Sequence, residues 1–478
     1  MRSYGYGSKL QCAAGLLFVT VAFGQDIIRP GESVTGASTE RPATVTNGYI
    51  VTFAPGTSKN TRALTALQAG AQMRYNYENL DAISVTATSN AINALRSHPA
   101  VVRVIPDSIH RGKAKPGSGG GGTPLPLDTR QIVSNEVQRI GIPETDSDGS
   151  GIGIALLDTG IDFNHPDLAP APNTTATAYN AFTPGASCQD DGGHGTHLSG
   201  LIAAQNNGIG ILGVAPAAKL YCVKVLDSTI SGPDSVIMAG LDWVLQNRNR
   251  VNPHIRVVNL SFGRPLASGE TLDNSPLRPL IQSLYQAGVV VVAAAGNSPD
   301  VEISQIVPAG FPETLAIASS VATDGIRTCF LLGYDLPSVP ADTASGFTTD
   351  GPGVTTTAPG EERTDIVTLG SAGCVGLQYG TLSTTLNTTG ATRKLVPGLQ
   401  EARGTSFSAA LVTGVVARIM EKQLVPATFN GAEVEGIRSW IRNNSSRPGI
   451  APLDHPWAGV IYNYTFDGVR EGIVQAPK

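Results

Sequence analysis

Residues 153–160 of the chain read Gly-Ile-Ala-Leu-Leu-Asp-Thr-Gly, and this stretch decides the fold class. From Gly153 to Leu157 it is almost continuously apolar, which is typical of a strand with both faces covered, and the last three residues form a turn. Similar apolar runs occur at 219–226, 257–260, 289–294 and 315–319. They alternate with helical patterns at 197–205, 235–246, 276–287 and 406–422. The alternation predicts an α/β fold with a parallel sheet that has helices on both faces.

A second, smaller set of patterns precedes this region. Strand patterns at 49–53, 81–87 and 101–105 alternate with helical patterns at 59–72 and 90–97. These predict a compact α/β module over residues 48–110.

Two stretches between the periodic segments have the composition of loops. Residues 113–124 read Lys-Ala-Lys-Pro-Gly-Ser-Gly-Gly-Gly-Gly-Thr-Pro, which predicts an exposed, flexible linker. The stretch 322–403 is rich in Gly, Thr, Ser and Pro, and it predicts long surface loops with one or two β-hairpins.

Composition excludes several classes of protein. The chain has 478 residues, of which 41% are hydrophobic and 15% charged, so it can bury a sizeable core and is not a disordered chain. The 33 Lys and Arg against 38 Asp and Glu give a net charge of −5. Because no basic block could neutralise a run of phosphates, we expect no nucleic-acid partner.

The N-terminus has the pattern of a secretory signal. Arg2 and Lys9 precede an apolar run at 12–23, and Ala22 and Gly24 place small residues before a cut at Gln25. A membrane anchor is the alternative, but the run is shorter than the ~20 residues that span a bilayer, and no later run comes close. The sequence therefore predicts a secreted, extracellular protein with no membrane contact.

Removal of that signal would take Cys12 and leave four cysteines. An even number in an exported protein permits two disulfides among three pairings, of which we favour Cys329 with Cys374. A free buried thiol is the alternative for Cys222, which lies in an apolar strand pattern.

Three segments carry the residues of a nucleophilic site. Asp158 ends a buried strand at the carboxyl edge of the sheet, where open α/β folds bind ligands. His194 lies in Gly-His-Gly-Thr-His, and Ser406 lies at the first turn of a long apolar helix. In such a triad the carboxylate orients the imidazole, the imidazole takes the hydroxyl proton, and the hydroxyl attacks an acyl carbon.

The transition state of that reaction needs hydrogen-bond donors for its oxyanion. The helix that begins near Ser406 offers unpaired N–H groups and a partial positive charge. Asn297 follows the strand pattern 290–294 and could donate a second hydrogen bond from its side-chain amide.

These motifs together resemble those of the subtilisin-like serine peptidases, or subtilases. The order Asp158-Thr-Gly, His194-Gly-Thr-His and Gly-Thr-Ser406 matches the family, and Asn297 falls at its oxyanion position. The resemblance covers about 124–450, while 48–110 resembles the ferredoxin-like inhibitory propeptide of many subtilases. We therefore expect a signal peptide over 1–24, a short linker over 25–47, a propeptide over 48–112, a flexible linker over 113–128 and a catalytic domain over 129–478.

The resemblance also assigns roles where the motif alone is ambiguous. His194 is expected to be catalytic and His197, three residues later, to pack in the core. The chain departs from the family at Ala410, where a proline is usual, which could alter the start of the helix slightly. Asp-Thr-Gly also occurs in aspartic peptidases, but those need two such carboxylates and only one is present here.

Subtilases bind a peptide as an extended strand between two edge segments. The resemblance implies that these edges and the pocket for the residue before the cleaved bond (P1) are Ile230, Ser231, Gly232, Ser261, Phe262, Gly263, Ala294, Ala295 and Gly296. The small and apolar lining, with no charge at the base near Ile306 and Val307, predicts a preference for apolar or aromatic P1 residues. Alternatively, Phe262 only packs in the core.

The family also suggests a structural calcium ion. The loop 204–211 follows the His194 helix, and in calcium-binding relatives it cooperates with an Asp and an N-terminal Gln. An ordinary Asn-Gly turn is the alternative. The ligands that the resemblance implies are Gln131, Asp167, Gln205, Asn207, Ile209 and Ile211.

The function that we expect is a secreted serine endopeptidase that processes its own precursor. Its partners would be protein or peptide substrates and its own propeptide, and we expect a monomer. Residues of about 108–118 could reach the neighbouring cleft as a tethered substrate. A catalytically inactive binding protein and an esterase are the alternatives, but all four polar groups are present, and the Gly-x-Ser-x-Gly elbow of esterases is not.

Overall fold

The computed structural model describes residues 42–112, 131–322, 342–345, 347–363, 378–379, 381–389, 394–446 and 472–478. The expected signal peptide, the linker from Lys113, and the Cys329–Cys374 pair lie outside these residues. Among the described residues, no helix is long and apolar enough to cross a membrane.

The N-terminal module is a β-α-β-β-α-β unit. Its sheet is antiparallel in the order β2-β3-β1-β4, which confirms the ferredoxin-like prediction. The side chains of Ser58 and Thr88 accept hydrogen bonds from the first turns of its two helices. The elements are β1 (Thr44–Phe53), α1 (Lys59–Gln68), β2 (Gln72–Asn76), β3 (Ala82–Thr86), α2 (Ser89–Ser97) and β4 (Val101–Arg111).

Several features of this module differ from the sequence prediction: β1, expected from residue 49, begins at Thr44, and β2 was not predicted. The helix expected to reach residue 72 ends at Gln68, because Gly70 adopts a positive φ of 74° and the chain turns into β2. The last strand, expected to end at residue 105, continues to Arg111 as β4. This extension takes the strand beyond its own module.

The second module is built on a sheet of order β15-β14-β13-β11-β9-β5-β7-β6. Every neighbouring pair is parallel except β14 and β15, which confirms the predicted parallel α/β sheet. The strands are β5 (Gly153–Asp158), β6 (Tyr179–Asn180), β7 (Lys219–Lys224), β9 (Ile255–Leu260), β11 (Val290–Ala294), β13 (Thr314–Val321), β14 (Val354–Arg363) and β15 (Gln378–Tyr379).

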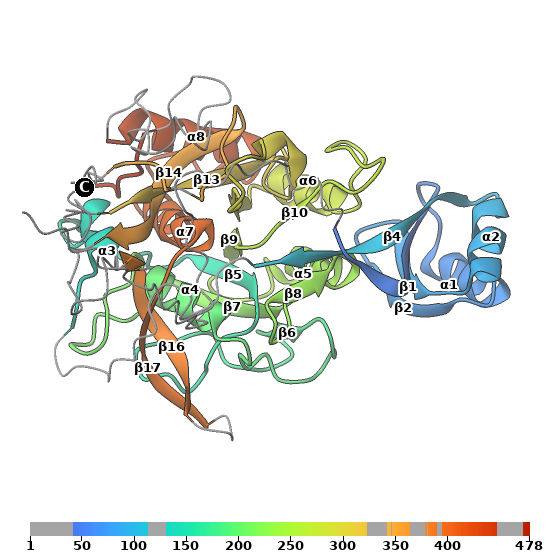
Figure 1. Cartoon of the computed structure of the whole chain (residues 1–478), viewed down its shortest axis with the longest axis horizontal. Helices are drawn as coiled ribbons and strands as arrows, with labels where there is room; N and C mark the ends of the chain where they lie inside the picture. Colours follow the sequence, from blue (N-terminus) through green and yellow to red (C-terminus); the bar gives the residue numbers. More distant parts are fainter. Residues whose placement is uncertain are drawn as a thin grey trace, which may run out of the picture. The chain divides into compact units, whose positions relative to one another are not determined.

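Helices cover both faces of this sheet (Figure 1). Successive residues of β5 alternate between two hydrophobic clusters, with Ile154 and Leu156 in one and Ala155 and Leu157 in the other. The first cluster includes α4, α7 and α8, and the second includes α5 and α6. The helices are α3 (Asn135–Arg139), α4 (His194–Ala203), α5 (Asp234–Asn247), α6 (Arg278–Gln286), α7 (Thr405–Glu421) and α8 (Gly431–Asn444).

The remaining elements include two that the sequence patterns did not predict, β14 and α8. Strands β16 (Thr381–Thr389) and β17 (Lys394–Ala402) form the antiparallel hairpin expected in the stretch 322–403. Helix α7 runs without interruption through the buried Ala410, so the missing proline leaves it continuous. Short elements are β8 (Ser231–Pro233), β10 (Arg264–Pro265), β12 (Ile306–Val307) and the 3-10 turn η1 (Ile303–Gln305).

A disulfide joins Cys188 to Cys222 on β7. The alternative of a free buried thiol at Cys222 is therefore wrong.

Candidate active site

The first pair of candidate catalytic residues joins the end of β5 to the start of α4. Oδ1 of Asp158 accepts hydrogen bonds from Nδ1 of His194, at 2.8 Å, and from the Thr159 amide, at 2.7 Å. Both side chains of the pair are fully buried. The carboxylate therefore fixes the orientation of the ring and leaves Nε2 as the other reactive nitrogen.

Glycines allow α4 to begin this close to β5. Gly193 caps the helix with a φ of 82°, which favours glycine. A Cβ atom at Gly195 would lie 2.1 Å from the carbonyl oxygen of Gly160, so only glycine fits there.

Asp190, which the sequence analysis did not single out, holds the start of α4. One of its oxygens accepts from the amides of Gly192 and Gly193, and the other accepts from the amide and hydroxyl of Thr196. A carboxylate just before a helix start is a capping signal that could have identified it.

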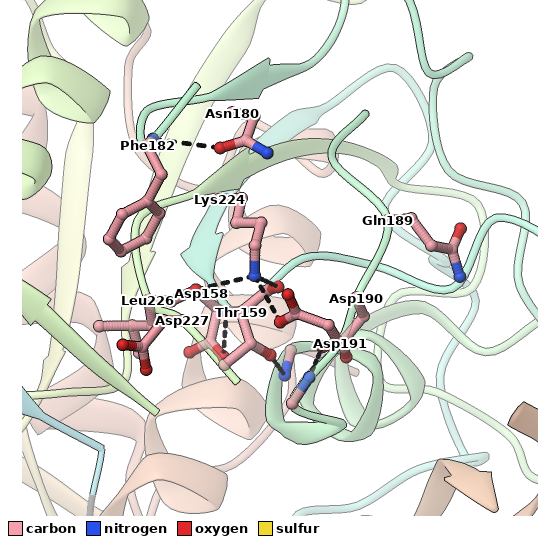
Figure 2. A network of polar contacts seen from close by, with 12 residues as sticks. Asp158, Thr159, Asn180, Phe182, Gln189, Asp190, Asp191, Lys224, Leu226 and Asp227 are labelled. Carbon is pink, nitrogen blue, oxygen red and sulfur yellow. Dashed lines mark hydrogen bonds and ion pairs between the residues drawn. The ribbon is translucent and has the colours of Figure 1, made fainter. Parts of the chain in front are cut away.

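Lys224, at the end of β7, holds the backbone next to Asp158 (Figure 2). Its ammonium group donates to the carbonyl oxygens of Thr159 (2.5 Å) and Leu226 (2.9 Å), and it pairs with Asp191 at 2.7 Å. The side chain is 7% exposed. A single lysine at the end of an apolar strand pattern does not indicate this role, so the role of Lys224 was not predicted from the sequence.

Ser406 lies in the first turn of α7, and the ring of the next residue, Phe407, has its centroid 5.9 Å from that of His194. Its hydroxyl donates to the carbonyl oxygen of Ser261 at 2.9 Å, and Nε2 of His194 has no hydrogen-bond partner among the described residues. The Ser261 hydroxyl in turn donates to the Ser406 carbonyl oxygen at 2.9 Å. The hydrogen bond between a catalytic serine and histidine is often long or poorly aligned until the substrate is bound.

Asn297 lies on the other side of the nucleophile. Its Oδ1 accepts from the amide (3.0 Å) and the hydroxyl (2.8 Å) of Thr405, the residue before Ser406. Asn297 and Ser406 both line the same cavity. Because the side-chain oxygen of Asn297 is used in this way, its Nδ2 group is the part of the side chain that remains to donate a hydrogen bond.

Five of the nine expected substrate-binding residues line this cavity. Ala295 does not, since it is fully buried and its amide donates to the Ile317 carbonyl oxygen. Residues 230–232 instead pair with the end of β4 and with Gly112. The cavity is lined by Ser261, Phe262, Gly263, Ala294, Gly296, Asn297, Ile306, Thr405 and Ser406, with Arg111, Arg264 and Pro265.

The last residues of β4 lie between the two edge segments. His110 pairs with Gly232 in an antiparallel ladder, and Arg111 exchanges hydrogen bonds of 3.2 and 3.3 Å with Gly263. The amide of Gly112 donates to the Ile230 carbonyl oxygen at 2.9 Å. A Cβ atom on Gly112 would lie 3.5 Å from Cε1 of His194, so the strand ends beside the catalytic ring.

The propeptide also contacts α5. Asp107 on β4 accepts from the amide (2.9 Å) and hydroxyl (2.6 Å) of Ser235, so it caps α5. Burial raises the pKa of Asp107 to about 6. Farther along α5, Asp242 accepts from the amides of Glu78 (2.7 Å) and Asn79 (2.8 Å).

Four of the six expected calcium ligands converge. Nε2 of Gln131 donates to the carbonyl oxygens of Gln205 (2.5 Å) and Ile211 (3.1 Å), and Oδ2 of Asp167 accepts from the Ile211 amide at 2.9 Å. The other Asp167 oxygen is buried with no partner among the described residues. Burial raises the pKa of Asp167 to about 7.

Of the other two expected ligands, Asn207 also lies at Asp167, since burial raises the pKa of that carboxyl and the Asn207 side chain is one of the groups that lower it. Asn207 also contacts Ile209. The Ile209 amide donates to Oδ1 of Asn207 at 3.1 Å. Within the described ranges, no group of three or more His, Cys, Asp or Glu is placed to hold a metal. A cation here would depend on carbonyl and amide oxygens together with one carboxylate.

Comparisons with known proteins agree with this geometry. The model of the subtilase family matches residues 149–456, and that of peptidase inhibitor I9 matches residues 48–111. The chain is 32% identical over 323 residues to subtilisin E of Bacillus subtilis (strain 168), which covers 67% of this chain and 75% of that protein. It is 35% identical over 250 residues to an alkaline protease of Shouchella clausii, covering 52% and 57%.

A solved structure shows the same fold. Fervidolysin from Fervidobacterium pennivorans, a keratinolytic enzyme related to subtilisin, matches with a TM-score of 0.63 at 19% identity. The match covers 92% of this chain and 61% of that longer chain. The family models and the relatives show that the chain belongs to the subtilase family and is a subtilisin-like serine endopeptidase with an N-terminal inhibitory propeptide domain.

Proposed function

We propose that Asp158, His194 and Ser406 are the catalytic triad. The observation that carries the assignment is the 2.8 Å bond from His194 to Asp158, with the opposite ring nitrogen lacking a partner among the described residues and the Phe407 ring, next to Ser406, near that of His194. Nε2 would take the proton of Ser406 as its Oγ attacks the substrate carbonyl, and Asp158 would stabilise the resulting imidazolium. Labelling with a fluorophosphonate tests this, since native protein should be labelled at Ser406 and the His194→Ala variant should not.

Asn297 would donate to the oxyanion together with the start of α7. Loss of such a donor lowers kcat about 10²–10³-fold, with little change in KM. Asn297→Ala should show this pattern, with a melting temperature close to that of native protein. A change in KM alone would contradict the assignment.

β4 occupies the cleft as a substrate strand would, which supports self-processing. Arg111 is opposite Gly263 in an antiparallel pairing, so a substrate strand that continued in the same register would bring the second residue after Arg111 opposite Ser261, whose carbonyl bonds to Ser406. Counting along the chain gives Lys113, so we expect cleavage of the 113–114 bond, inside the window 108–118. Because the segment is tethered, the attack of Ser406 on it is effectively unimolecular. Cleavage of this bond therefore does not need a preferred P1 residue.

In free substrates we expect apolar or aromatic P1 residues to be preferred. Ala294, Gly296 and Ile306 give the cavity small and apolar walls, and the nearby Arg264 is paired with two carboxylates. A peptide library digested with mature protein would test this. Cleavage confined to bonds after Lys or Arg would contradict it.

We propose that the site of Gln131, Asp167, Gln205 and Ile211 holds a structural calcium ion. The buried, unpartnered oxygen of Asp167 and two converging carbonyl groups fit a hard cation that takes oxygen ligands. Rotation of the Gln131 amide would supply a further oxygen. A chelator should lower the melting temperature of mature protein, and the Asp167→Asn variant should respond less.

Secretion and a monomeric state complete the proposal. The N-terminal charge and apolar pattern supports export. We expect the mature domain to appear in the culture medium. In size-exclusion chromatography with light scattering, it should have the mass of a monomer.

A further inference from the structure

A buried histidine lies in the cleft beyond the catalytic centre. His110 of β4 is 0% exposed, and its Nε2 lies 2.6 Å from Oδ1 of Asp234, the first residue of α5. The edge of its ring meets the Phe262 ring, with centroids 5.6 Å apart and planes at 81°. The imidazole is thus held at one end by a carboxylate and on its side by an aromatic wall.

Arg264 and Glu270 complete the surroundings of Asp234. Arg264 donates to both oxygens of Asp234, at 3.2 and 2.9 Å, and to both oxygens of Glu270, at 2.5 and 2.9 Å. Two carboxylates share one guanidinium, so the cluster retains one negative charge. All three side chains are at least nine-tenths buried.

Neutral imidazole fits this cluster better than a cation. Burial, opposed by the bond to Asp234, lowers the pKa of His110, and its Nδ1 has no partner among the described residues. A second proton there would be buried without an acceptor. A lysine side chain there would have to be buried as a charged ammonium group, which costs more than burying a neutral imidazole.

The position of His110 along β4 relates this pocket to catalysis. His110 is opposite Gly232, and Gly112, two residues later, lies beside the His194 ring. A substrate bound in the same register would place its fourth residue before the cleaved bond (P4) against Asp234.

We propose that Asp234, held by Arg264 and Glu270, forms a subsite that selects histidine at the P4 position of substrates. The inference rests on the proposed function, because it takes β4 as a guide to how substrates bind. An aliphatic side chain would fill the space but would remove the shorter of the two hydrogen bonds that Oδ1 of Asp234 accepts, leaving only the longer one from Arg264. Sites built to hydrogen-bond a substrate group discriminate strongly against analogues that lack it.

The test uses mature native protein and synthetic peptides with the sequence of residues 105–118. The parent peptide carries His110, and three others carry His110→Leu, His110→Phe and His110→Lys. We expect kcat/KM for the 113–114 bond to be about tenfold or more higher for the parent than for each of the others. Cleavage of the Leu or Phe peptide as fast as the parent would overturn the inference.

A variant shows whether Asp234 is the selecting group. In Asp234→Leu, we expect the ratio of kcat/KM for the parent peptide to that for the Leu peptide to fall to about one or below. Asp242→Asn, on the same helix, contacts the propeptide away from the cleft and should keep the native ratio. A purely structural role of Asp234 would slow both peptides equally and keep the ratio, which would overturn the inference.

The two levels of the account fail differently. If Asp234→Leu does not fold, the peptide series on native protein still decides the question. If native protein cleaves none of the peptides and also cleaves no full-length protein substrate, the proposed function fails rather than the subsite.

Discussion

The described residues include two buried histidine–aspartate pairs with different surroundings. His194 and Asp158 join β5 to α4 at 2.8 Å, and His110 and Asp234 join the propeptide to α5 at 2.6 Å. In the first pair the second ring nitrogen has no partner among the described residues, and the ring lies near Phe407, next to Ser406. In the second, the carboxylate is held by Arg264, and the ring packs against Phe262. We therefore expect the neighbouring group to decide the role of each pair: a serine hydroxyl for catalysis in the first, and a guanidinium for recognition in the second.

The sharpest way to separate the pairs is to remove the charge of Asp158. Asp158→Asn should lower kcat about 10⁴-fold, because the amide no longer stabilises the imidazolium or its tautomer. Steady-state kinetics on a peptide substrate measure this. The control is Asp146→Asn, an exposed carboxylate paired with Lys422, which should keep native kcat. A loss of less than tenfold in Asp158→Asn would remove Asp158 from the triad.

A second prediction concerns the support behind the catalytic pair. Lys224→Met leaves the carbonyl oxygens of Thr159 and Leu226 without their buried donor, which should lower the free energy of unfolding by about 1–3 kcal/mol. Lys219→Met, at the start of the same strand, removes only an exposed bond to Ala169 and should change it by less than about 0.5 kcal/mol. Urea unfolding in a Ser406→Ala background, which prevents self-digestion, compares the two. Equal effects would show that Lys224 has no special role.

The weakest expected effect is the pH dependence of the recognition pair. Because burial lowers the pKa of His110 below its ordinary 6.5, the neutral ring stabilises the folded precursor above about pH 6.5, and this stabilisation is lost as the pH falls. Burial tends to raise the pKa of Asp234, but Arg264 and then His110 lower it, with a net lowering. The Asp234 carboxylate therefore stays charged. Arg264 also lowers the pKa of Glu270 against the effect of burial.

Asp107 acts in the opposite direction, since its pKa is raised to about 6, so a comparison of variants is needed. The difference in unfolding free energy between Ser406→Ala and Ser406→Ala/His110→Leu should become smaller as the pH falls from 7.5 to 5. A difference that widens at acid pH would mean that the imidazolium is the bound form.

The catalytic pair could be predicted from the sequence, and the recognition pair could not. Asp158 and His194 lie in short motifs at a strand end and a helix start, where glycines mark unusual backbone geometry. His110, Asp234, Arg264 and Glu270 are ordinary polar residues separated by up to 160 positions. The extension of β4 along β8 brings His110 to the other three, and that pairing depends on a partner edge that local patterns do not encode.

The same distinction holds for the rest of the fold. Buried strands of the sheet were predicted because continuous apolar runs identify them, as at β5 and β11. Strand β14 was missed because its polar sequence, Val-Thr-Thr-Thr-Ala-Pro-Gly-Glu-Glu-Arg, resembles a loop. The disulfide between Cys188 and Cys222 joins segments whose proximity depends on the sheet order.

The most direct test of the account is the N-terminal sequence of the larger product that native precursor forms on its own. The position of β4 in the cleft predicts that this product begins at Ala114 and that Ser406→Ala precursor stays uncut. Cleavage of Ser406→Ala at the native rate, or a first cut outside residues 108–118, would contradict the claim that β4 is bound as the substrate of its own catalytic centre.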